Sequence, residues 1–424
     1  MSTDAAHKTR TLWLVGVLHA FTHVYHVALM PLYLLMQQDF GFASVGQATS
    51  MVTILMLAYF LPSYGLGVLA DRVNRKRLLG LGLAINALGF VGLSFAPNYA
   101  CAVAAVIVAG IGGSFYHPAA TAMVARLFPV GTGRALGLAG IGASAGFFCG
   151  PIYAGWRAGA LELARGAAAW RQPVLELGLL GLAMAGAFAW LADDEKPARA
   201  VGRTVVSTQK IFPTRALWTL FLLCAVAFGL RDFTGSSMGS LGSLFLQHAH
   251  GYDPTRTGLA LSGIFLASAV SNPLFGHLSD RGRFRWAGFV LLTAAALVAL
   301  FPHLPASWTI PAYLAYGFFF MASYPMIEAA LMESVPDAVR GRVFGLFITV
   351  GGMIGNASHW AVGAWVKHLG PAANSVESYF GGYGLIAGLL VIALLGLPCL
   401  RAIRRREHLD PGAEAQPEIV THTV

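Results

Sequence analysis

Long apolar segments alternate with short polar segments along the whole chain. Many of the apolar segments reach roughly 18 residues or more, which lets a helix cross a hydrocarbon core ~30 Å thick. They are continuously apolar instead of alternating, which argues against a β-barrel and for membrane-spanning helices. The pattern predicts twelve helices, near residues 12–36, 45–70, 78–96, 100–124, 134–158, 173–192, 216–246, 256–279, 286–302, 308–333, 342–368 and 379–400.

The composition favours a surface that faces lipid. Of the 424 residues, 56% are hydrophobic and 11% are charged, whereas soluble domains carry about 25% charged residues. The net charge of +9 would suggest a nucleic-acid partner for a soluble protein. Here the basic residues lie in the loops between apolar segments, where membrane proteins carry them. We therefore expect a lipid bilayer, and no nucleic acid, among the partners.

The basic residues gather in alternate loops. One set of loops holds most of them, and the other set has a single basic stretch, at 157–172. The positive-inside rule then predicts that both termini lie in the cytoplasm of a multi-pass protein, with a bacterial inner membrane as the favoured location. The basic residues of the first set are Lys8, Arg10, Arg72, Arg75, Lys76, Arg77, Arg126, Arg203, Lys210, Arg215, Arg281, Arg283, Arg285, Arg340, Arg401, Arg404, Arg405 and Arg406.

One polar stretch divides the helices into six and six. Residues 193–215 read as a cytoplasmic linker between an N-terminal half, 1–192, and a C-terminal half, 216–401. The polar segment 402–424 is expected to be a cytoplasmic tail.

An internal repeat supports two related halves. The loop GVLADRVNRKR at 67–77 has a weaker copy, GHLSDRGRFR, at 276–285. Further pairs follow in the same order and at nearly the same spacing. The matched pairs are Gly67 with Gly276, Asp71 with Asp280, Arg72 with Arg281, Pro118 with Pro325, Arg134 with Arg342, and Gly137 with Gly345. Parallel repeats of six helices are typical of one large class of transporters, which bind substrate near mid-membrane between the halves.

The first loop carries the complete signature G-x-L-x-D-R-x-x-R-[KR], at Gly67, Leu69, Asp71, Arg72, Arg75 and Lys76. By this motif and its copy the chain resembles the major facilitator superfamily over most of its length. The resemblance implies an all-α fold of two pseudo-symmetric six-helix halves that rock about a central site. Because a carboxylate can bind a helix N-terminus or an arginine, we interpret the loop as a gate latch. The expected gating residues are Gly67, Asp71, Arg72, Arg75, Lys76, Arg134, Asp280, Arg281 and Arg342.

A second signature lies on the predicted fifth helix. The motif G-x8-G-x3-G-P-x2-G-G is typical of drug and metabolite antiporters of the superfamily. Here it reads Gly137, Gly146, Gly150, Pro151, Ala154 and Gly155, with one glycine replaced by alanine. Glycines at these intervals let a neighbouring helix approach, and proline bends the helix. The motif favours an exporter over an importer.

Within the superfamily the chain is similar to the fosmidomycin-resistance exporters. The similarity rests on His19 and its surroundings, on the run GIGGSFYHP that ends at Pro118, and on Arg231. Two positions depart from that subfamily, since His23 and Ala119 stand where it tends to carry acids. Both departures remove a carboxylate, so proton coupling by those acids is not carried over.

Three histidines lie on one face of the predicted first helix. His19, His23 and His26 are spaced at helical intervals and fall near mid-membrane. They could form a proton relay, or bind an anionic substrate when the imidazoles are protonated. A divalent-metal site is a weaker alternative. A hydrogen-bonded packing face is the plain structural alternative.

Other polar residues fall inside predicted membrane helices, where ionisable groups are costly and usually functional. Arg231 is the candidate for binding an anionic group, and Asp232 is the candidate for protonation during transport. Neighbours on a helix point in different directions, so these two need not pair. The remaining candidates for substrate or proton binding are Tyr116, His117, Tyr324 and Glu328.

The sequence therefore predicts a secondary active transporter: a proton-coupled antiporter that exports a small drug or metabolite, with anionic compounds among the candidate substrates. A proton-coupled importer of an organic anion and a divalent-metal transporter remain alternatives. No Walker loop occurs, so a proton gradient is the expected energy source, with no cofactor and a monomeric protein. A membrane di-iron enzyme is the rival class, but His248 and His250 are expected at the outer membrane face, away from His19 and His23. We expect no enzymatic activity.

Overall fold

The computed structural model describes residues 3–70, 73–128, 132–193, 210–279, 282–336 and 339–409. Within these ranges the chain is helical and contains no strand. The predicted linker and tail fall largely outside this part, since 194–209 and 410–424 are not described.

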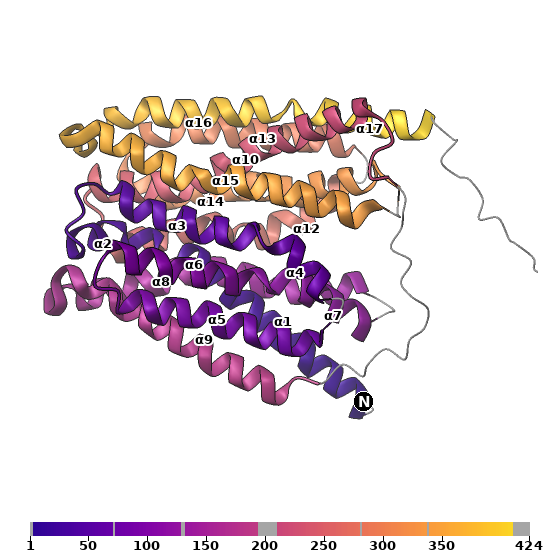
Figure 1. Ribbon diagram of the computed structural model, residues 1–424. Coiled ribbons are helices and arrows are strands. Elements are labelled where there is room, and N and C mark those ends of the chain that lie inside the picture. The colour runs from indigo at the N-terminus through magenta and orange to yellow at the C-terminus, as the bar shows by residue number, and fades with distance from the viewer. Residues whose placement is uncertain are drawn as a thin grey trace, which may run out of the picture.

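The helices before the linker fill the lower part of Figure 1. In chain order they are α1 (Thr3–Val27), η1 (Met30–Leu32), α2 (Tyr33–Asp39), α3 (Gly46–Phe60), α4 (Ser63–Ala70), α5 (Arg75–Ser94), α6 (Tyr99–Ser114), α7 (Tyr116–Leu127), α8 (Thr132–Arg165), η2 (Gly166–Trp170) and α9 (Arg171–Leu191). We call this group the first half.

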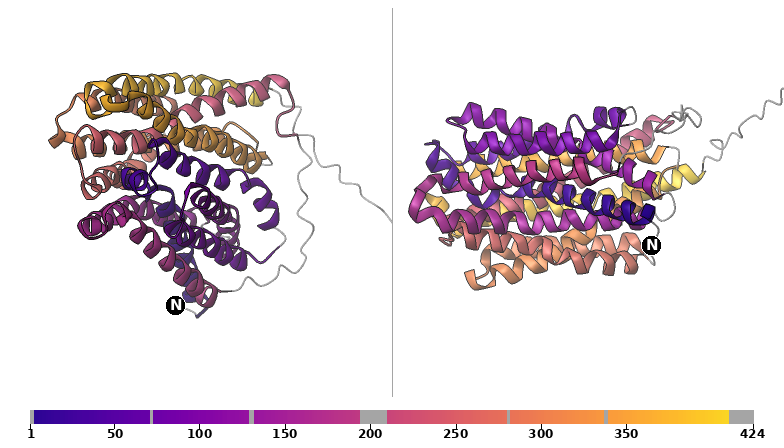
Figure 2. Two further views of the ribbon diagram at one scale, coloured as in Figure 1. Left: turned by 60° about the vertical axis from the view of Figure 1, so that its left-hand side comes forward. Right: turned by 90° about the horizontal axis from the view of Figure 1, so that it is seen from below.

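The helices after the linker form the second half, which fills the upper part of Figure 1 and is seen from two further sides in Figure 2. They are α10 (Arg215–His248), α11 (Pro254–Leu266), α12 (Ser268–Ser279), α13 (Arg283–Leu300), η3 (Phe301–His303), η4 (Ala306–Trp308), α14 (Thr309–Met332), α15 (Arg340–Leu369), η6 (Gly370–Asn374), η7 (Glu377–Tyr379), α16 (Phe380–Ala393) and α17 (Gly396–Leu409).

Each of the twelve predicted ranges is occupied by one to three helical elements in succession. Prolines account for several of the breaks, because proline lacks the N–H that would bond four residues back. Pro62 stands between α3 and α4, and Pro398 follows the turn between α16 and α17. Nine segments among the described residues are long and apolar enough to cross a membrane.

Side-chain caps fix several helix starts. Asn74, Asn98, Thr214 and Asp253 each accept a hydrogen bond from a backbone N–H in the first turn of the helix that follows. Such caps satisfy N–H groups that have no partner inside the helix.

The two ends of the bundle differ in charge. One end, which we call the basic end, carries the N-terminus and the end of α17 (Figure 1). Arg283 and Arg404 meet there at Glu333, and Arg340 donates to the neighbouring Met332 carbonyl. The opposite end, which we call the far end, carries the turns after α2, α5, α10 and α15.

The basic stretch at the far end is paired locally. Arg157 binds Glu176, with Nη2 2.8 Å from Oε1, and Arg171 binds Asp39, with Nε 2.6 Å from Oδ2. Arg171 also donates to two backbone carbonyls that end α5. Local pairing therefore explains why this stretch departs from the charge bias of the other loops.

Large apolar side chains cover the outside of the bundle. Those that are exposed include Leu81, Leu88, Trp156, Leu179, Leu180, Trp190, Leu222, Leu223, Val270, Leu292 and Leu385. Apolar surface this extensive is what a lipid-facing protein presents, and it agrees with the composition.

Candidate functional site

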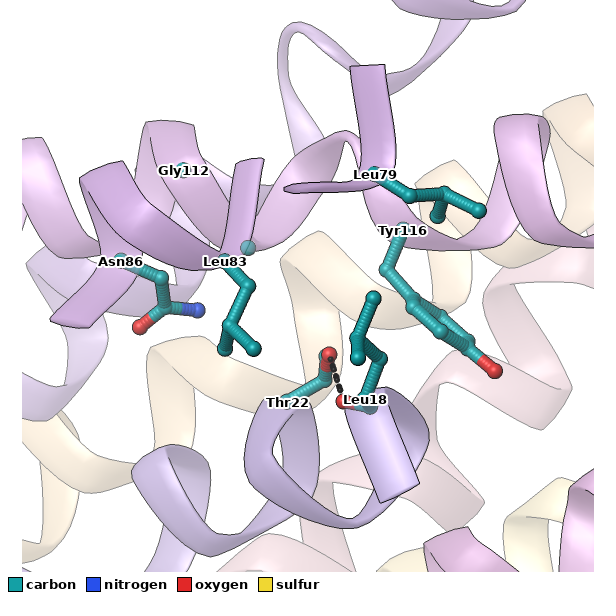
Figure 3. Close-up of a pocket in the computed structure, with 8 residues that line it drawn as sticks. Leu18, Thr22, Leu79, Leu83, Asn86, Gly112 and Tyr116 are labelled. Atoms are coloured by element: carbon teal, nitrogen blue, oxygen red, sulfur yellow. Dashed lines mark hydrogen bonds between the residues drawn. The ribbon is translucent and has the colours of Figure 1, made fainter. Parts of the chain in front are cut away.

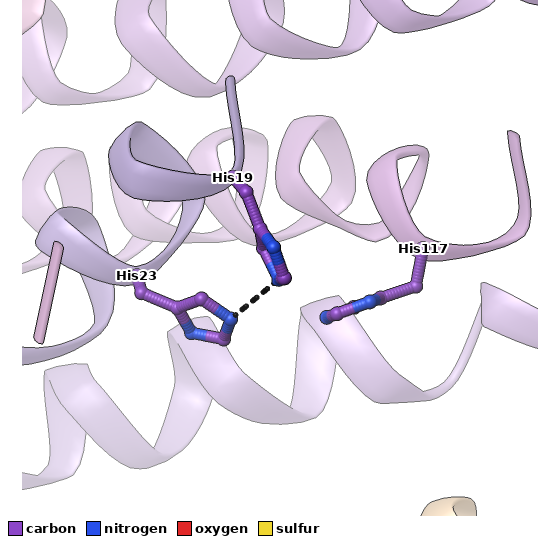
Figure 4. A group of neighbouring side chains, drawn as sticks. All are labelled: His19, His23 and His117. Carbon is purple, nitrogen blue, oxygen red and sulfur yellow. Dashed lines mark hydrogen bonds between the residues drawn. The ribbon is translucent and has the colours of Figure 1, made fainter. Parts of the chain in front are cut away.

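Histidines from two elements of the first half meet near the middle of the bundle. His19 and His23 lie one turn apart on α1, and His117 lies at the start of α7 (Figure 4). One ring nitrogen from each lies within 4.8 Å of the others. His23 Nε2 is 3.1 Å from His19 Nε2, and His19 Nδ1 is 3.1 Å from the Ala139 carbonyl oxygen. We call these three residues the histidine cluster.

Aromatic rings enclose the histidine cluster. Tyr116 stacks on His19 with ring centroids 4.6 Å apart, and Phe147 stacks on His23 at 4.2 Å. Tyr116 is held in place by a hydrogen bond from its hydroxyl to the Val15 carbonyl, at 3.0 Å. His117 is exposed, so the cluster is open on that side.

His26, the third predicted histidine of α1, is not one of the three clustered residues, although its ring contacts His23 edge-on with centroids 5.1 Å apart. It is buried and packs edge-on against Tyr59 of α3, with ring centroids 4.6 Å apart. His26 Nε2, His23 Nδ1 and the Tyr59 hydroxyl are buried without a hydrogen-bond partner. Buried polar atoms without partners are rare, so this region is unusual for a packing core.

A small internal cavity lies beside the cluster, between α1, α5 and the α6–α7 junction (Figure 3). Its lining is partly polar: Thr22 donates to the Leu18 carbonyl at 3.0 Å, and Asn86 Oδ1 has no partner. The lining residues are Leu18, Thr22, Leu79, Leu83, Asn86, Gly112, Gly113 and Tyr116.

A buried ion pair lies at the middle of α10 in the second half. Arg231 Nη2 is 2.8 Å from Asp232 Oδ1, and the two side chains are 2% and 19% exposed. The two residues therefore pair with each other, although helical spacing alone did not require it. The guanidinium lies over the Tyr324 ring of α14, 3.9 Å from its centroid. Glu328, one turn along α14, interacts electrostatically with both charges.

Glycines of α15 make room for this pair. A Cβ at Gly351 would lie 2.7 Å from Asp232 Oδ2, and a Cβ at Gly355 would lie 2.8 Å from Asp232 Cβ. Arg231 Nη1 remains buried without a hydrogen-bond partner. The ion pair is therefore enclosed by α10, α14 and α15, with one donor left unpaired.

The glycines of the antiporter motif contact helices of both halves. In α8, a Cβ at Gly146 would collide with the Ala20 carbonyl of α1, and one at Gly150 would lie 2.9 Å from Val27. A Cβ at Gly155 would collide with the Pro254 carbonyl of α11, in the second half. Gly137 faces open space, and Pro151 lies inside α8, which continues through it.

The halves also join through hydrogen bonds towards the far end. The Thr53 hydroxyl of α3 donates to the Asn356 carbonyl of α15 at 2.8 Å. Ser240 of α10 lies 2.9 Å from the Tyr33 hydroxyl and 2.5 Å from His359 Nδ1. These contacts link α2 and α3 of the first half to α10 and α15 of the second.

Several predicted gating residues lie outside the described residues: Asp71, Arg72, Asp280 and Arg281. Of the others, Gly67 lies in α4, Arg75 and Lys76 open α5, Arg134 is exposed near the start of α8, and Arg342 lies in the first turn of α15. The latch therefore stays a prediction.

Some residues near the two polar groups were not predicted from the sequence, because their role depends on the helix that they contact. Tyr59, Thr53, Gly351 and Gly355 gain their significance from what they face across helix interfaces. The Gly-x3-Gly spacing in α15 is the one local signal that could have indicated a close approach. His248 is the last residue of α10, at the far end and away from the cluster, and its predicted place at the outer membrane face stays a prediction.

Comparison with known families gives one match that spans most of the chain. The family described as the Major Facilitator Superfamily matches residues 12–358. The match includes α1 through to the middle of α15 and therefore both clusters of polar residues described above.

Several of the similar proteins are named as efflux or resistance proteins. The multi-drug resistance efflux pump PmrA of Streptococcus pneumoniae is 27% identical, over 73% of this chain and 77% of that protein. The multidrug resistance protein MdtH of Edwardsiella ictaluri is 26% identical, over 83% and 86%. The fosmidomycin resistance protein of Escherichia coli is 22% identical, over 82% and 84%.

Solved structures share the fold. A bacterial homologue of the human lysosomal transporter Spinster superposes with a TM-score of 0.74 at 15% identity, covering 94% of this chain and 97% of that chain. A proton dependent oligopeptide transporter gives a TM-score of 0.73 at 13% identity, covering 94% and 100%.

Proposed function

The chain belongs to the major facilitator superfamily, and on this premise we propose that it is a proton-coupled antiporter exporting a small drug or metabolite. The named relatives support export, because the efflux pump PmrA and two resistance proteins match over most of the chain. The antiporter motif supports it too, since its glycines bring α8 against α1 and, across the halves, against α11.

The observation that carries the proposal is the buried pair of Arg231 and Asp232 beside Tyr324 and Glu328. Burying charged side chains inside a membrane protein costs free energy, so a buried ion pair at this depth is a candidate functional site. Asp232 and Glu328 are carboxylates that can take up a proton, and Arg231 can bind an anionic group. The histidine cluster in the first half supplies further polar contacts for a substrate held between the halves.

Exchange requires that proton and substrate compete for the same groups. A substrate that donates hydrogen bonds or positive charge to Asp232 and Glu328 binds when both are ionised. Protonation then weakens its binding, and the substrate leaves as protons enter. Inward movement of protons can thus drive outward movement of substrate by differential affinity between the two states.

A second candidate, uptake of a small organic anion together with a proton, is favoured by the unpaired Nη1 of Arg231. Protonated Asp232 would release its arginine, which would then bind an anionic substrate. Proton binding would then strengthen substrate binding, whereas in the antiport proposal it weakens substrate binding.

The contacts between Thr53 and Asn356 and between Gly155 and Pro254 fit a state closed at the far end. We assign the basic end to the cytoplasm, with both termini there, and take the protein to act as a monomer in a bacterial inner membrane. The repeated loop at 67–77 and 276–285 is proposed as the latch that closes the basic end in the alternate state.

The sign of proton linkage tests the proposal. Purified protein in detergent with a weakly buffered pH dye is mixed with fosmidomycin or with a quinolone. The first drug is named for the relative from Escherichia coli, and the second for the quinolone resistance protein NorA of Staphylococcus aureus, which is 20% identical over 78% of this chain and 83% of that protein. An antiporter releases protons as the ligand binds, and its affinity falls as pH is lowered. Proton uptake with rising affinity at low pH would establish the anion importer, and binding without any proton change would contradict both.

A further inference from the structure

The histidine cluster has the composition of a transition-metal site. Its members are imidazoles alone: one nitrogen from each of His19, His23 and His117 lies within 4.8 Å of the others, and no carboxylate belongs to the group. Imidazole suits zinc, copper and nickel, whereas magnesium and calcium prefer oxygen ligands.

The surroundings of His19 fix its tautomer for this role. The Ala139 carbonyl oxygen, 3.1 Å from His19 Nδ1, can only accept a hydrogen bond, so Nδ1 of the neutral ring carries the proton. The lone pair is then on Nε2, which faces His23 (Figure 4). Metal-ligating histidines typically donate their other N–H to a carbonyl or a carboxylate in this way.

The spacing is close to that of a coordination sphere. Zinc binds imidazole nitrogen at about 2.0–2.1 Å in a tetrahedron, which places neighbouring nitrogens about 3.3 Å apart. His19 Nε2 and His23 Nε2 are already 3.1 Å apart. His117 lies just beyond the break between α6 and α7 and is exposed, so its ring has room to rotate inward.

We propose that His19, His23 and His117 bind one divalent transition-metal ion of the zinc type, with the fourth position open to water or to an anionic ligand. As the ion binds, His23 Nε2 gives up the hydrogen bond to His19 and becomes a ligand. Its proton transfers to Nδ1, which has no partner of its own. Three neutral ligands leave the full charge of the ion in place, which favours hydroxide, chloride or a carboxylate as the fourth ligand.

Cobalt titration of the full chain, purified in detergent without a polyhistidine tag, tests the site. Co²⁺ bound in a tetrahedron gives visible absorption bands that octahedral aqueous cobalt lacks. We expect saturable binding of one Co²⁺ per chain and its displacement by Zn²⁺. His117→Ala should weaken the affinity at least tenfold, and the buried His23→Gln should do the same if its melting temperature is preserved.

His26→Gln is the matched control, because His26 lies on the same face of α1 and contacts His23 edge-on at 5.1 Å, yet its nitrogens are not among the three proposed ligands. It should keep the affinity and the absorption bands of the wild type. The site is refuted if no saturable binding occurs, if His117→Ala binds as tightly as the wild type, or if His26→Gln alone loses binding. The readout is metal binding, so its outcome is independent of the proposed export.

Discussion

The Thr53 hydroxyl of α3 is inserted into the backbone hydrogen-bond ladder of α15 at Asn356. It donates to the Asn356 carbonyl at 2.8 Å and accepts from the Trp360 N–H at 2.9 Å. Inside a regular helix these two backbone groups would bond to each other. A side chain of one half thus bonds to two backbone groups of a helix in the other half, and these bonds exist only while the halves are together at this level.

Replacing Thr53 by valine should weaken closure at the far end. The variant keeps the shape of the side chain, and the Asn356 carbonyl and the Trp360 N–H can bond to each other within α15, so the net loss is about 1 kcal/mol. That shifts the balance between states roughly fivefold towards opening at the far end. Labelling of a cysteine placed on the far-end part of α3 should speed up accordingly.

Thr349→Val is the control for this measurement. Thr349 lies on the same helix, α15, and bonds only to the Gly345 carbonyl one turn back, at 2.9 Å. Equal labelling rates in Thr53→Val and the control would contradict a role for the inserted hydroxyl.

Alanine at Gly355 should abolish transport while the fold is kept. Its Cβ would lie 2.8 Å from Asp232 Cβ and close to the Asp232 backbone, which cannot rotate away. Overpacking of this kind costs about 1–3 kcal/mol and would displace Asp232. Gly351→Ala should be milder, because its Cβ meets the carboxylate oxygen, which can swing aside.

Gly345→Ala provides the control on α15, since a Cβ there meets nothing within 4 Å. The transport rate in proteoliposomes should be highest for the control, lower for Gly351→Ala and lowest for Gly355→Ala. If Gly355→Ala transports like the control, the packing of Asp232 against α15 has no functional importance.

The glycine pair Gly155 and Gly258 should set how closely the halves approach at the far end. A Cβ at Gly258 would collide with the Pro151 carbonyl of α8, as one at Gly155 would with Pro254 of α11. Leucine at Gly155 should therefore separate α8 from α11 and raise the accessibility of the far-end surface. Spin-label distances between these helices should lengthen.

Gly137→Leu, in the same motif but facing open space, should leave those distances unchanged. Lengthening in both variants would show that the effect is a general disturbance of α8.

Arg171 should be a main contributor to the stability of the first half. It binds Asp39 at 2.6 Å, donates to the Ser94 and Ala96 carbonyls and lies over the Trp170 ring. Arg171→Ala leaves Asp39 without its cationic partner, and we expect a loss of about 3 kcal/mol. The melting temperature, read at one fixed scan rate, should fall by several degrees.

Arg165→Ala is the comparison, because Arg165 is exposed and donates to Gln172 alone. Its melting temperature should stay close to that of the wild type. A fall as large as that of Arg171→Ala would mean that charge at the far end, and not the Arg171 contacts, is what stabilises the protein.

The fold was predictable because long apolar segments indicate membrane-spanning helices, and all twelve predicted ranges are helical. The breaks at η1 and between α11 and α12 were not predicted, because Pro31 at the first and Ser268 at the second lie inside segments whose overall apolar character indicated one continuous helix. The stripe of His19 and His23 was visible from helical spacing, but their meeting with His117 depends on how α1 and α7 pack. Likewise, only the rotamer of Arg231 decides that it folds back onto its neighbour Asp232.

The measurement that tests the central claim most directly is pH-driven efflux by Asp232→Asn in proteoliposomes, beside a wild type that transports fosmidomycin or a quinolone. The amide keeps the size of the carboxylate but cannot exchange a proton, and a melting curve confirms that the variant is folded. We predict that wild-type transport follows the imposed pH gradient, whereas Asp232→Asn still exchanges substrate for substrate but ignores the gradient. A variant that responds to the gradient like the wild type would contradict proton coupling at the Arg231–Asp232 pair.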